Sequence, residues 1–126
     1  MHLLVVDDSS TMRRIIINTL KKLGHNEIIE ASNGREAIDR LAKDRVDLVI
    51  TDWNMPEMSG IEFVRSVRTS RSREQLPILM VTTNAAHDDI VAAVEAGVNN
   101  YVVKPFTPET MREKIQAVTA GVEGGA

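Results

Sequence analysis

Five side chains able to handle a charged ligand follow short apolar runs of this sequence. Asp7 and Asp8 come after the first run, Asp52 after the third, Thr82 ends the fourth, and Lys104 follows the fifth. Such runs are typical of buried parallel strands, and open α/β sheets bind ligands beyond the carboxyl ends of their strands. We therefore expect three carboxylates, one hydroxyl and one ammonium group to meet at a single edge of a sheet.

The three carboxylates predict a metal site. Like charges a few ångströms apart repel, so the cluster is costly unless a cation is shared among them. Oxygen ligands with no nearby His or Cys favour a hard divalent ion that keeps several waters, as Mg²⁺ does. We expect Asp8 and Asp52 to be direct ligands together with the backbone carbonyl at Asn54, and Asp7 to act through water.

A magnesium ion beside Lys104 and Thr82 indicates phosphoryl chemistry, because two cations and a hydroxyl donor suit phosphoryl oxygens. The sequence has no P-loop for a nucleotide and no cysteine nucleophile. A carboxylate can itself form an acyl phosphate, and Asp52 is the best-placed acceptor.

Each of these residues also has an ordinary structural explanation. Asp7 and Asp8 are of a type that caps helices, and Asp52 precedes residues common in turns. Thr82 alone would be a β-branched strand residue, and Lys104 alone a surface lysine. Their joint position at strand ends favours the shared site over five separate explanations.

Apolar runs alternate about five times with amphipathic stretches. We expect strands at Leu3 to Val6, Glu27 to Glu30, Asp47 to Thr51, Ile78 to Thr82 and Tyr101 to Val103. The stretches between them carry helical periodicity, and Gly24 and Gly97 each follow one of them as a stop signal. This alternation predicts an α/β fold: a doubly wound, five-stranded parallel sheet with five helices on its two faces.

Two helix starts are marked by local residue types. Ser59 and Glu62 have the spacing of a capping box, and Thr107 precedes Pro108 as a cap residue precedes a first-turn proline. We therefore expect one helix to begin after Ser59 and the last helix to begin at Pro108.

Composition limits the remaining possibilities. With 126 residues the chain fits one domain, which we place at 1–120, and the glycine-rich residues 121–126 are expected to form a flexible C-terminal tail. There is no Cys, which excludes disulfides and thiolate metal sites. The formal net charge of −3 argues against nucleic acid as a partner. The apolar start meets Asp7 at once, so we expect no membrane segment.

Three segments resemble the response-regulator receiver domains, and among them the single-domain, CheY-like receivers of chemotaxis. They are Val6-Asp7-Asp8-Ser9, the stretch from Thr51 to Gly60 (TDWNMPEMSG), and the stretch from Tyr101 to Phe106 (YVVKPF). The resemblance runs from about Leu3 to Val118. It implies a flavodoxin-like sheet of strand order 2-1-3-4-5, which is known for this family and is not worked out from the spacing. It also implies a cis peptide bond between Lys104 and Pro105.

The resemblance implies a role for each site residue. Asp52 would accept the phosphoryl group, and Asp7 and Asp8 would organise Mg²⁺. Thr82 and Lys104 would contact the phosphoryl oxygens.

The resemblance also implies roles for residues that would respond to phosphorylation or control how long the phosphoryl group persists. Tyr101 would be the aromatic residue that responds when Thr82 moves. Trp53, beside the acceptor, would report binding by its fluorescence. Asn54 and Asn84 stand where the family tunes access of the hydrolytic water, and Asn84 replaces an acidic residue found in enteric members.

The resemblance further implies a cytoplasmic, monomeric signalling switch and not a conventional enzyme, although it catalyses its own phosphorylation and dephosphorylation. Its phosphodonor would be a CheA-like histidine kinase, its target the flagellar motor switch protein, and a phosphatase is a further candidate partner. Because the receiver occupies nearly the whole chain, we expect output through protein contact, with no nucleic acid or membrane involved. The alternatives are a phosphorelay intermediate, a small Mg²⁺-dependent aspartyl-phosphate phosphohydrolase and a flavodoxin-like cofactor carrier.

Overall fold

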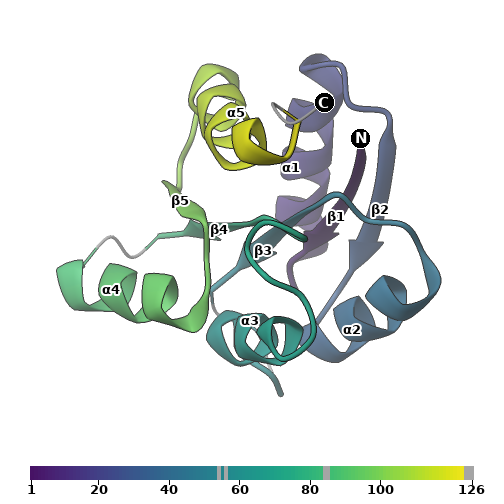
Figure 1. Cartoon of the computed structure of the whole chain (residues 1–126). Helices are drawn as coiled ribbons and strands as arrows, with labels where there is room; N and C mark the ends of the chain where they lie inside the picture. Colours follow the sequence, from purple (N-terminus) through teal and green to yellow (C-terminus); the bar gives the residue numbers. More distant parts are fainter. Residues whose placement is uncertain (54, 56, 84–85, 124–126) are drawn as a thin grey trace.

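The computed structural model describes residues 1–53, 55, 57–83 and 86–123, except the side chains of residues 87, 88 and 121–123. Across these residues five parallel strands form one sheet in the order β2-β1-β3-β4-β5. Helices α1 and α5 cover one face of the sheet, and α2, α3 and α4 cover the other (Figure 1). The expected fold class, strand order and number of helices are confirmed within the described part of the chain.

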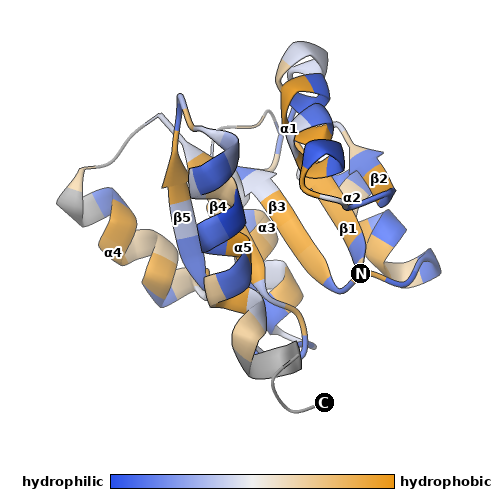
Figure 2. Cartoon of the chain, turned by 90° about the horizontal axis from the view of Figure 1, so that it is seen from above, coloured by the Kyte–Doolittle hydropathy of each residue, from blue (hydrophilic) through white to orange (hydrophobic). Residues whose placement is uncertain are grey.

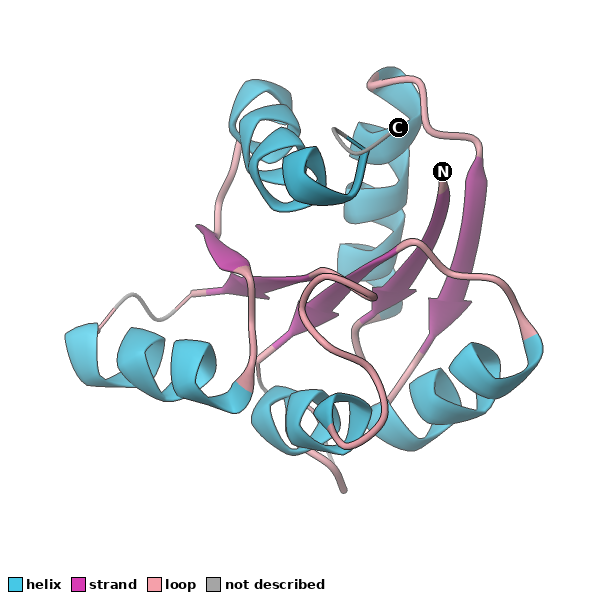
Figure 3. Cartoon of the chain, viewed as in Figure 1, coloured by secondary structure: helices cyan, strands magenta, loops and turns pink. Residues whose placement is uncertain are grey.

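Strands and helices alternate along the chain (Figure 3). The strands are β1 His2–Val6, β2 Glu27–Ala31, β3 Leu48–Asp52, β4 Ile78–Thr82 and β5 Asn100–Val103. The helices are α1 Ser10–Lys22, α2 Gly34–Lys43, α3 Gly60–Arg68, α4 His87–Ala96 and α5 Pro108–Glu123.

The core has two layers because successive strand residues point to opposite faces of the sheet. In β1, Leu4 and Val6 belong to the cluster under α2, α3 and α4, whereas Leu3 and Val5 belong to the cluster under α1 and α5. Most residues of the central strands are therefore apolar on both sides (Figure 2). In the three central strands β1, β3 and β4, charged side chains accordingly lie only at the strand ends.

Several predicted boundaries shift by a few residues. Strand β3 starts one residue later than expected because Asp47 is used at the opposite end of the sheet, where its carboxylate accepts a 2.8 Å hydrogen bond from the His2 N–H. The strand in turn extends to include Asp52. Helix α5 continues to Glu123, three residues into the segment expected to be a tail.

The marked helix ends are confirmed. Ser59 and Glu62 form a reciprocal capping box at the start of α3. The Thr107 hydroxyl accepts a 3.1 Å hydrogen bond from the Thr110 N–H just where α5 begins. Beyond α1, Gly24 has a φ of 97°, a conformation that glycine adopts at little cost.

Arg68, the last residue of α3, joins two loops. Its guanidinium donates to the backbone carbonyls of Gly97 at 2.9 Å, Ser72 at 3.0 Å and Leu76 at 2.8 Å, and to the Asn99 side-chain oxygen at 2.9 Å. Burial lowers the pKa of Arg68 to about 10. The sequence analysis did not anticipate this contact, which fixes the end of α4 to the segment before β4.

Candidate functional site

The three predicted acidic residues meet at the carboxyl edge of the sheet. Asp7 and Asp8 directly follow β1, and Asp52 is the last residue of the adjacent strand β3. One carboxylate oxygen from each of the three lies within 4.8 Å of the others. This grouping of oxygen donors suits a small hard divalent cation.

Lys104 supplies the positive charge of the site. Its ammonium nitrogen lies 3.2 Å from Asp52 Oδ1 and 3.5 Å from Asp7 Oδ2, and its side chain is only 13% exposed. The lysine follows β5, and its backbone N–H donates to the Thr82 carbonyl at 2.8 Å. The next peptide bond, between Lys104 and Pro105, is cis, as the resemblance implied.

Asp7 is the most deeply buried member of the cluster, with 1% of its surface exposed. Its Oδ1 accepts a 2.9 Å hydrogen bond from the Ser9 N–H. Among the described residues, Oδ2 accepts no hydrogen bond and has only the 3.5 Å ion pair with Lys104. Burial raises the pKa of Asp7, the bond from Ser9 opposes that effect, and the charge of Asp52 adds to it. A buried carboxylate oxygen in this state would gain from a further positive charge or donor, so the residues fit a bound Mg²⁺.

The two hydrogen bonds that the described residues make to the Asp52 carboxylate reach one of its oxygens. Its Oδ1 accepts hydrogen bonds from the Trp53 N–H at 2.8 Å and from the Lys104 ammonium at 3.2 Å. Within the described residues both hydrogen bonds reach the same atom, which leaves Oδ2 as the oxygen able to bind a metal or attack an electrophile. The Asp52 side chain is 12% exposed.

The structure places the other predicted residues around this cluster. Thr82 is buried at the end of β4 and pairs with Val103 of β5. Trp53 is partly buried and packs against the core, next to the acceptor. Tyr101 is also partly buried, and the Lys114 ammonium lies 5.2 Å from the centre of its ring.

Two predicted positions, Asn54 and Asn84, lie outside the described residues.

Gly60 allows the segment after Asp52 to fold back closely. Its N–H donates to the Trp53 carbonyl at 2.8 Å. A Cβ atom at this position would lie 2.3 Å from the Asp52 backbone oxygen and 3.1 Å from the Trp53 Cα. Any larger residue would therefore push against the backbone of Asp52 and Trp53.

The sequence analysis missed Arg13, which contacts the site from α1. Its Nη1 donates to the Asp7 backbone carbonyl at 2.6 Å, and its Nε donates to Glu30 Oε1 at 2.9 Å. No short-range sequence pattern predicts this contact, because Glu30 lies in β2, 17 residues from Arg13.

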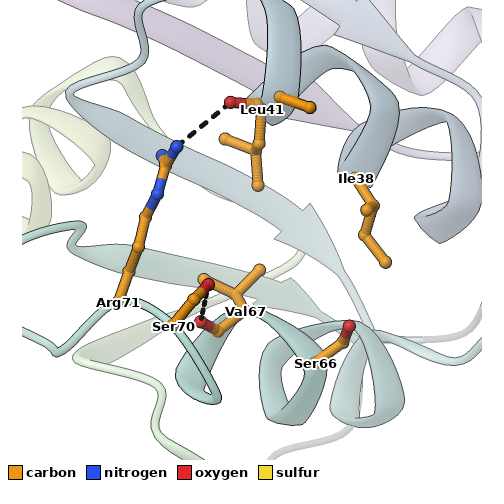
Figure 4. Close-up of a pocket in the computed structure, with 7 residues that line it drawn as sticks. Ile38, Leu41, Ser66, Val67, Ser70 and Arg71 are labelled. Carbon is orange, nitrogen blue, oxygen red and sulfur yellow. Dashed lines mark hydrogen bonds between the residues drawn. The ribbon is translucent and has the colours of Figure 1, made fainter.

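A pocket of 180 Å³ lies away from these residues, between α2 and α3. Figure 4 shows Ile38 and Leu41 on one side and Ser66 and Val67 on the other, with Arg71 bonded to the Leu41 carbonyl at 3.1 Å. It contains no carboxylate and no nucleophile from the acidic cluster. This pocket is therefore separate from the acidic cluster at the sheet edge.

The fold and the acidic cluster define an α/β domain with a carboxylate site at the carboxyl edge of its sheet, and comparison with known proteins gives its family. Residues 3–116 match the model of the response regulator receiver domain, and the chain belongs to that family. It is a CheY-like member, as the sequence motifs indicated.

The relatives are full-length matches. The chain is 55% identical to a chemotaxis protein CheY homolog of Campylobacter jejuni, over 100% of this chain and 99% of that protein. It is 48% identical to the chemotaxis protein CheY of Pseudomonas aeruginosa, over 98% of this chain and 100% of that one. The solved structure of the chemotaxis response regulator CheY4 of Vibrio cholerae aligns with a TM-score of 0.84 and 39% identity, covering 93% of this chain and 97% of that one.

Among the described helices, none combines the length and apolar character that crossing a membrane requires.

Proposed function

We propose that this chain is a chemotaxis response regulator that is phosphorylated on Asp52 in a Mg²⁺-dependent reaction. A CheA-like histidine kinase is the proposed donor, and the flagellar motor switch protein is the proposed target of the phosphorylated form. The chain would be a cytoplasmic monomer. The names of the full-length relatives support the chemotaxis assignment.

One observation carries the phosphoacceptor role. Asp52 lies 3.2 Å from the Lys104 ammonium and shares the site with Asp7 and Asp8, one carboxylate oxygen of each of the three lying within 4.8 Å of the others. A metal ion held by Asp8 and Asp52, with Asp7 acting through water, would neutralise phosphoryl oxygens. Lys104, already 3.2 Å from Asp52, could exchange that contact for a phosphoryl oxygen.

The transfer itself is a displacement at phosphorus. Asp52 Oδ2 attacks, an O–P bond forms, and the bond from phosphorus to the donor group breaks, with its electron pair leaving on the donor. From a phosphohistidine the leaving atom is a ring nitrogen, and from acetyl phosphate it is a carboxylate oxygen. The product is an acyl phosphate, which water later hydrolyses. The proposed role of Asn54 and Asn84 is to govern that water.

The proposed response begins at Thr82. A phosphoryl group on Asp52 would add about 1.5 to 2 negative charges and new acceptor oxygens, which would attract the Thr82 hydroxyl. Tyr101, two residues before the β5 partner of Thr82, could then turn further inward. Three exposed apolar side chains on the elements that flank β4 in sequence support protein contact there: Val91 and Val94 on α4 and Val103 on β5.

The direct test uses Trp53, the single tryptophan of the chain, as a fluorescent reporter. Titration with Mg²⁺ and acetyl phosphate should give a saturable emission change and a mass increase of one phosphoryl group. Asp52→Asn should lose the adduct, whereas Asp39→Asn, an exposed carboxylate on α2, should behave as the wild type. An adduct that persists in Asp52→Asn would contradict the assignment of the acceptor.

A second measurement separates the proposed output from a phosphorelay role. The phosphorylated form should bind a peptide from the motor switch protein more tightly than the unmodified form. Transfer of the phosphoryl group onward to a histidine phosphotransfer domain, without peptide binding, would favour the relay. Turnover of simple phosphate esters at ordinary enzyme rates would instead favour a phosphohydrolase.

A further inference from the structure

Arg13 bridges the loop that carries the acid pair and the neighbouring strand β2. Its Nη1 donates to the Asp7 backbone carbonyl at 2.6 Å, and its Nε pairs with Glu30 Oε1 at 2.9 Å. The Arg13 side chain is 17% exposed, compared with 53% for Glu30. The Arg13 side chain is thus mostly buried, and its guanidinium contacts both the Asp7 carbonyl and the Glu30 carboxylate.

The carbonyl that Arg13 holds belongs to the peptide unit joining Asp7 to Asp8. Because a peptide unit is planar, fixing its oxygen also fixes the direction in which the chain enters Asp8. The Asp7 N–H, on the preceding peptide, is already held by the Ala31 carbonyl at 3.2 Å. Arg13 therefore completes the fixing of the backbone on both sides of Asp7.

Asp8 depends on this arrangement more than its neighbours do. Asp7 is held by Ser9 and Lys104, and Asp52 by Trp53 and Lys104. In contrast, the Asp8 side chain is exposed and makes no hydrogen bond or ion pair with any residue that the structure describes. Among the described residues, the position of the Asp8 carboxylate is therefore restrained only through its own backbone.

We propose that Arg13 is a positioning residue for the metal site, which holds the peptide between Asp7 and Asp8 so that the Asp8 carboxylate faces the other two. The proposal rests on the proposed Mg²⁺-dependent function of the same cluster. Groups that orient metal ligands commonly change metal affinity by about 10- to 100-fold when they are removed.

The direction in which Mg²⁺ affinity changes when Arg13 is replaced distinguishes a positioning role from a purely electrostatic one. Arg13 carries a positive charge beside an acidic cluster, so removing it would tighten binding of a cation if charge alone mattered. Positioning predicts the opposite, because a loosened Asp8 pays more conformational entropy to reach the ion. A purely structural role would lower the stability of the fold and leave the affinity unchanged.

The experiment measures the Mg²⁺ dissociation constant by calorimetry, with Trp53 emission as a second readout, in four proteins. These are the wild type, Arg13→Met, Arg13→Lys and Arg14→Gln. Arg13→Lys keeps the charge but cannot bridge both partners, and Arg14 is an exposed neighbour that controls for charge. Thermal unfolding without Mg²⁺ records the stability of each fold.

We expect Arg13→Met to bind Mg²⁺ about tenfold more weakly, Arg13→Lys to be intermediate, and Arg14→Gln to bind as tightly as the wild type or slightly more tightly. Unchanged or tighter binding in Arg13→Met would overturn the positioning role while leaving the proposed function intact. Should Arg13→Met fail to fold, unchanged affinity in Arg13→Lys would overturn it instead. Absence of saturable Mg²⁺ binding in the wild type would overturn the proposed function and this inference together.

Discussion

Replacement of Asp7 by Asn should make the metal-free protein more stable. The wild-type Asp7 residue is 1% exposed, and its Oδ2 accepts no hydrogen bond from the part of the chain that the structure describes. Asn has the same shape, and its side-chain oxygen can still accept the bond from the Ser9 N–H. The substitution removes a buried charge and keeps the packing.

Two contributions set the size of the change. A buried acceptor without a hydrogen bond costs about 1–3 kcal/mol, and more when charged. Against this, Lys104 loses its 3.5 Å contact with Asp7. Because it keeps the shorter 3.2 Å contact with Asp52, it does not become an unpaired buried charge, which would cost about 3–5 kcal/mol. The free energy of unfolding should therefore rise by about 1–2 kcal/mol, and the melting temperature by about 4 °C for each kcal/mol.

Denaturation by urea at neutral pH, without metal and then with Mg²⁺, measures this change. At 100 times its dissociation constant a ligand stabilises the native state by about 2.7 kcal/mol. The wild type should gain this much, whereas Asp7→Asn should gain less because one carboxylate of the cluster is lost. The advantage of the variant should shrink or reverse when Mg²⁺ is added.

The same variant has a defined pH dependence. Because the folded-state pKa of Asp7 is raised above 3.8, the native state holds a proton that the unfolded state has released, so stability falls as pH rises through that window. Asp7→Asn has no carboxylate to ionise at this position, so its stability does not fall in this way. The difference in free energy of unfolding between the variant and the wild type should therefore diminish below pH 3.8. A metal-free variant less stable than the wild type at neutral pH would refute the reasoning, since the Lys104 ion pair would then outweigh the cost of burial.

Two further substitutions test the surrounding framework. Gly60→Ala should lower the free energy of unfolding by about 1–3 kcal/mol and shift the Trp53 emission, because the new Cβ would lie 2.3 Å from the Asp52 carbonyl oxygen; an unchanged spectrum and denaturation curve would contradict that crowding. Arg68→Met should cost about 3 kcal/mol or more in urea denaturation, because the carbonyls of two loops and Asn99 lose their donor; a loss below about 1 kcal/mol would show that water replaces the guanidinium at little cost.

The site was predictable because its residues stand at strand ends. Each of Asp7, Asp52 and Lys104 follows an apolar run, and parallel strands bring such positions to one edge whatever the lengths of the connecting helices. Strand β4 was expected at Ile78–Thr82 and is found there. These features follow from local residue types and from the topology alone.

Other contacts could not be predicted from local patterns. The partners of Arg68 at Gly97 and Asn99 are 29 and 31 residues away. The presence of an arginine in the sequence does not show which distant residues its long, flexible side chain contacts. The same holds for Arg13 and Glu30, which are 17 residues apart. The burial of Asp7 without a hydrogen bond at Oδ2 likewise depends on packing in three dimensions.

The attachment of α4 at its carboxyl end has a mechanical consequence. Arg68 and Arg73 donate hydrogen bonds to the Gly97 and Val94 carbonyls at that end. Arg68 is itself the last residue of α3. Because its guanidinium joins the end of α3 to the end of α4, a displacement of one of these helix ends would be transmitted directly to the other.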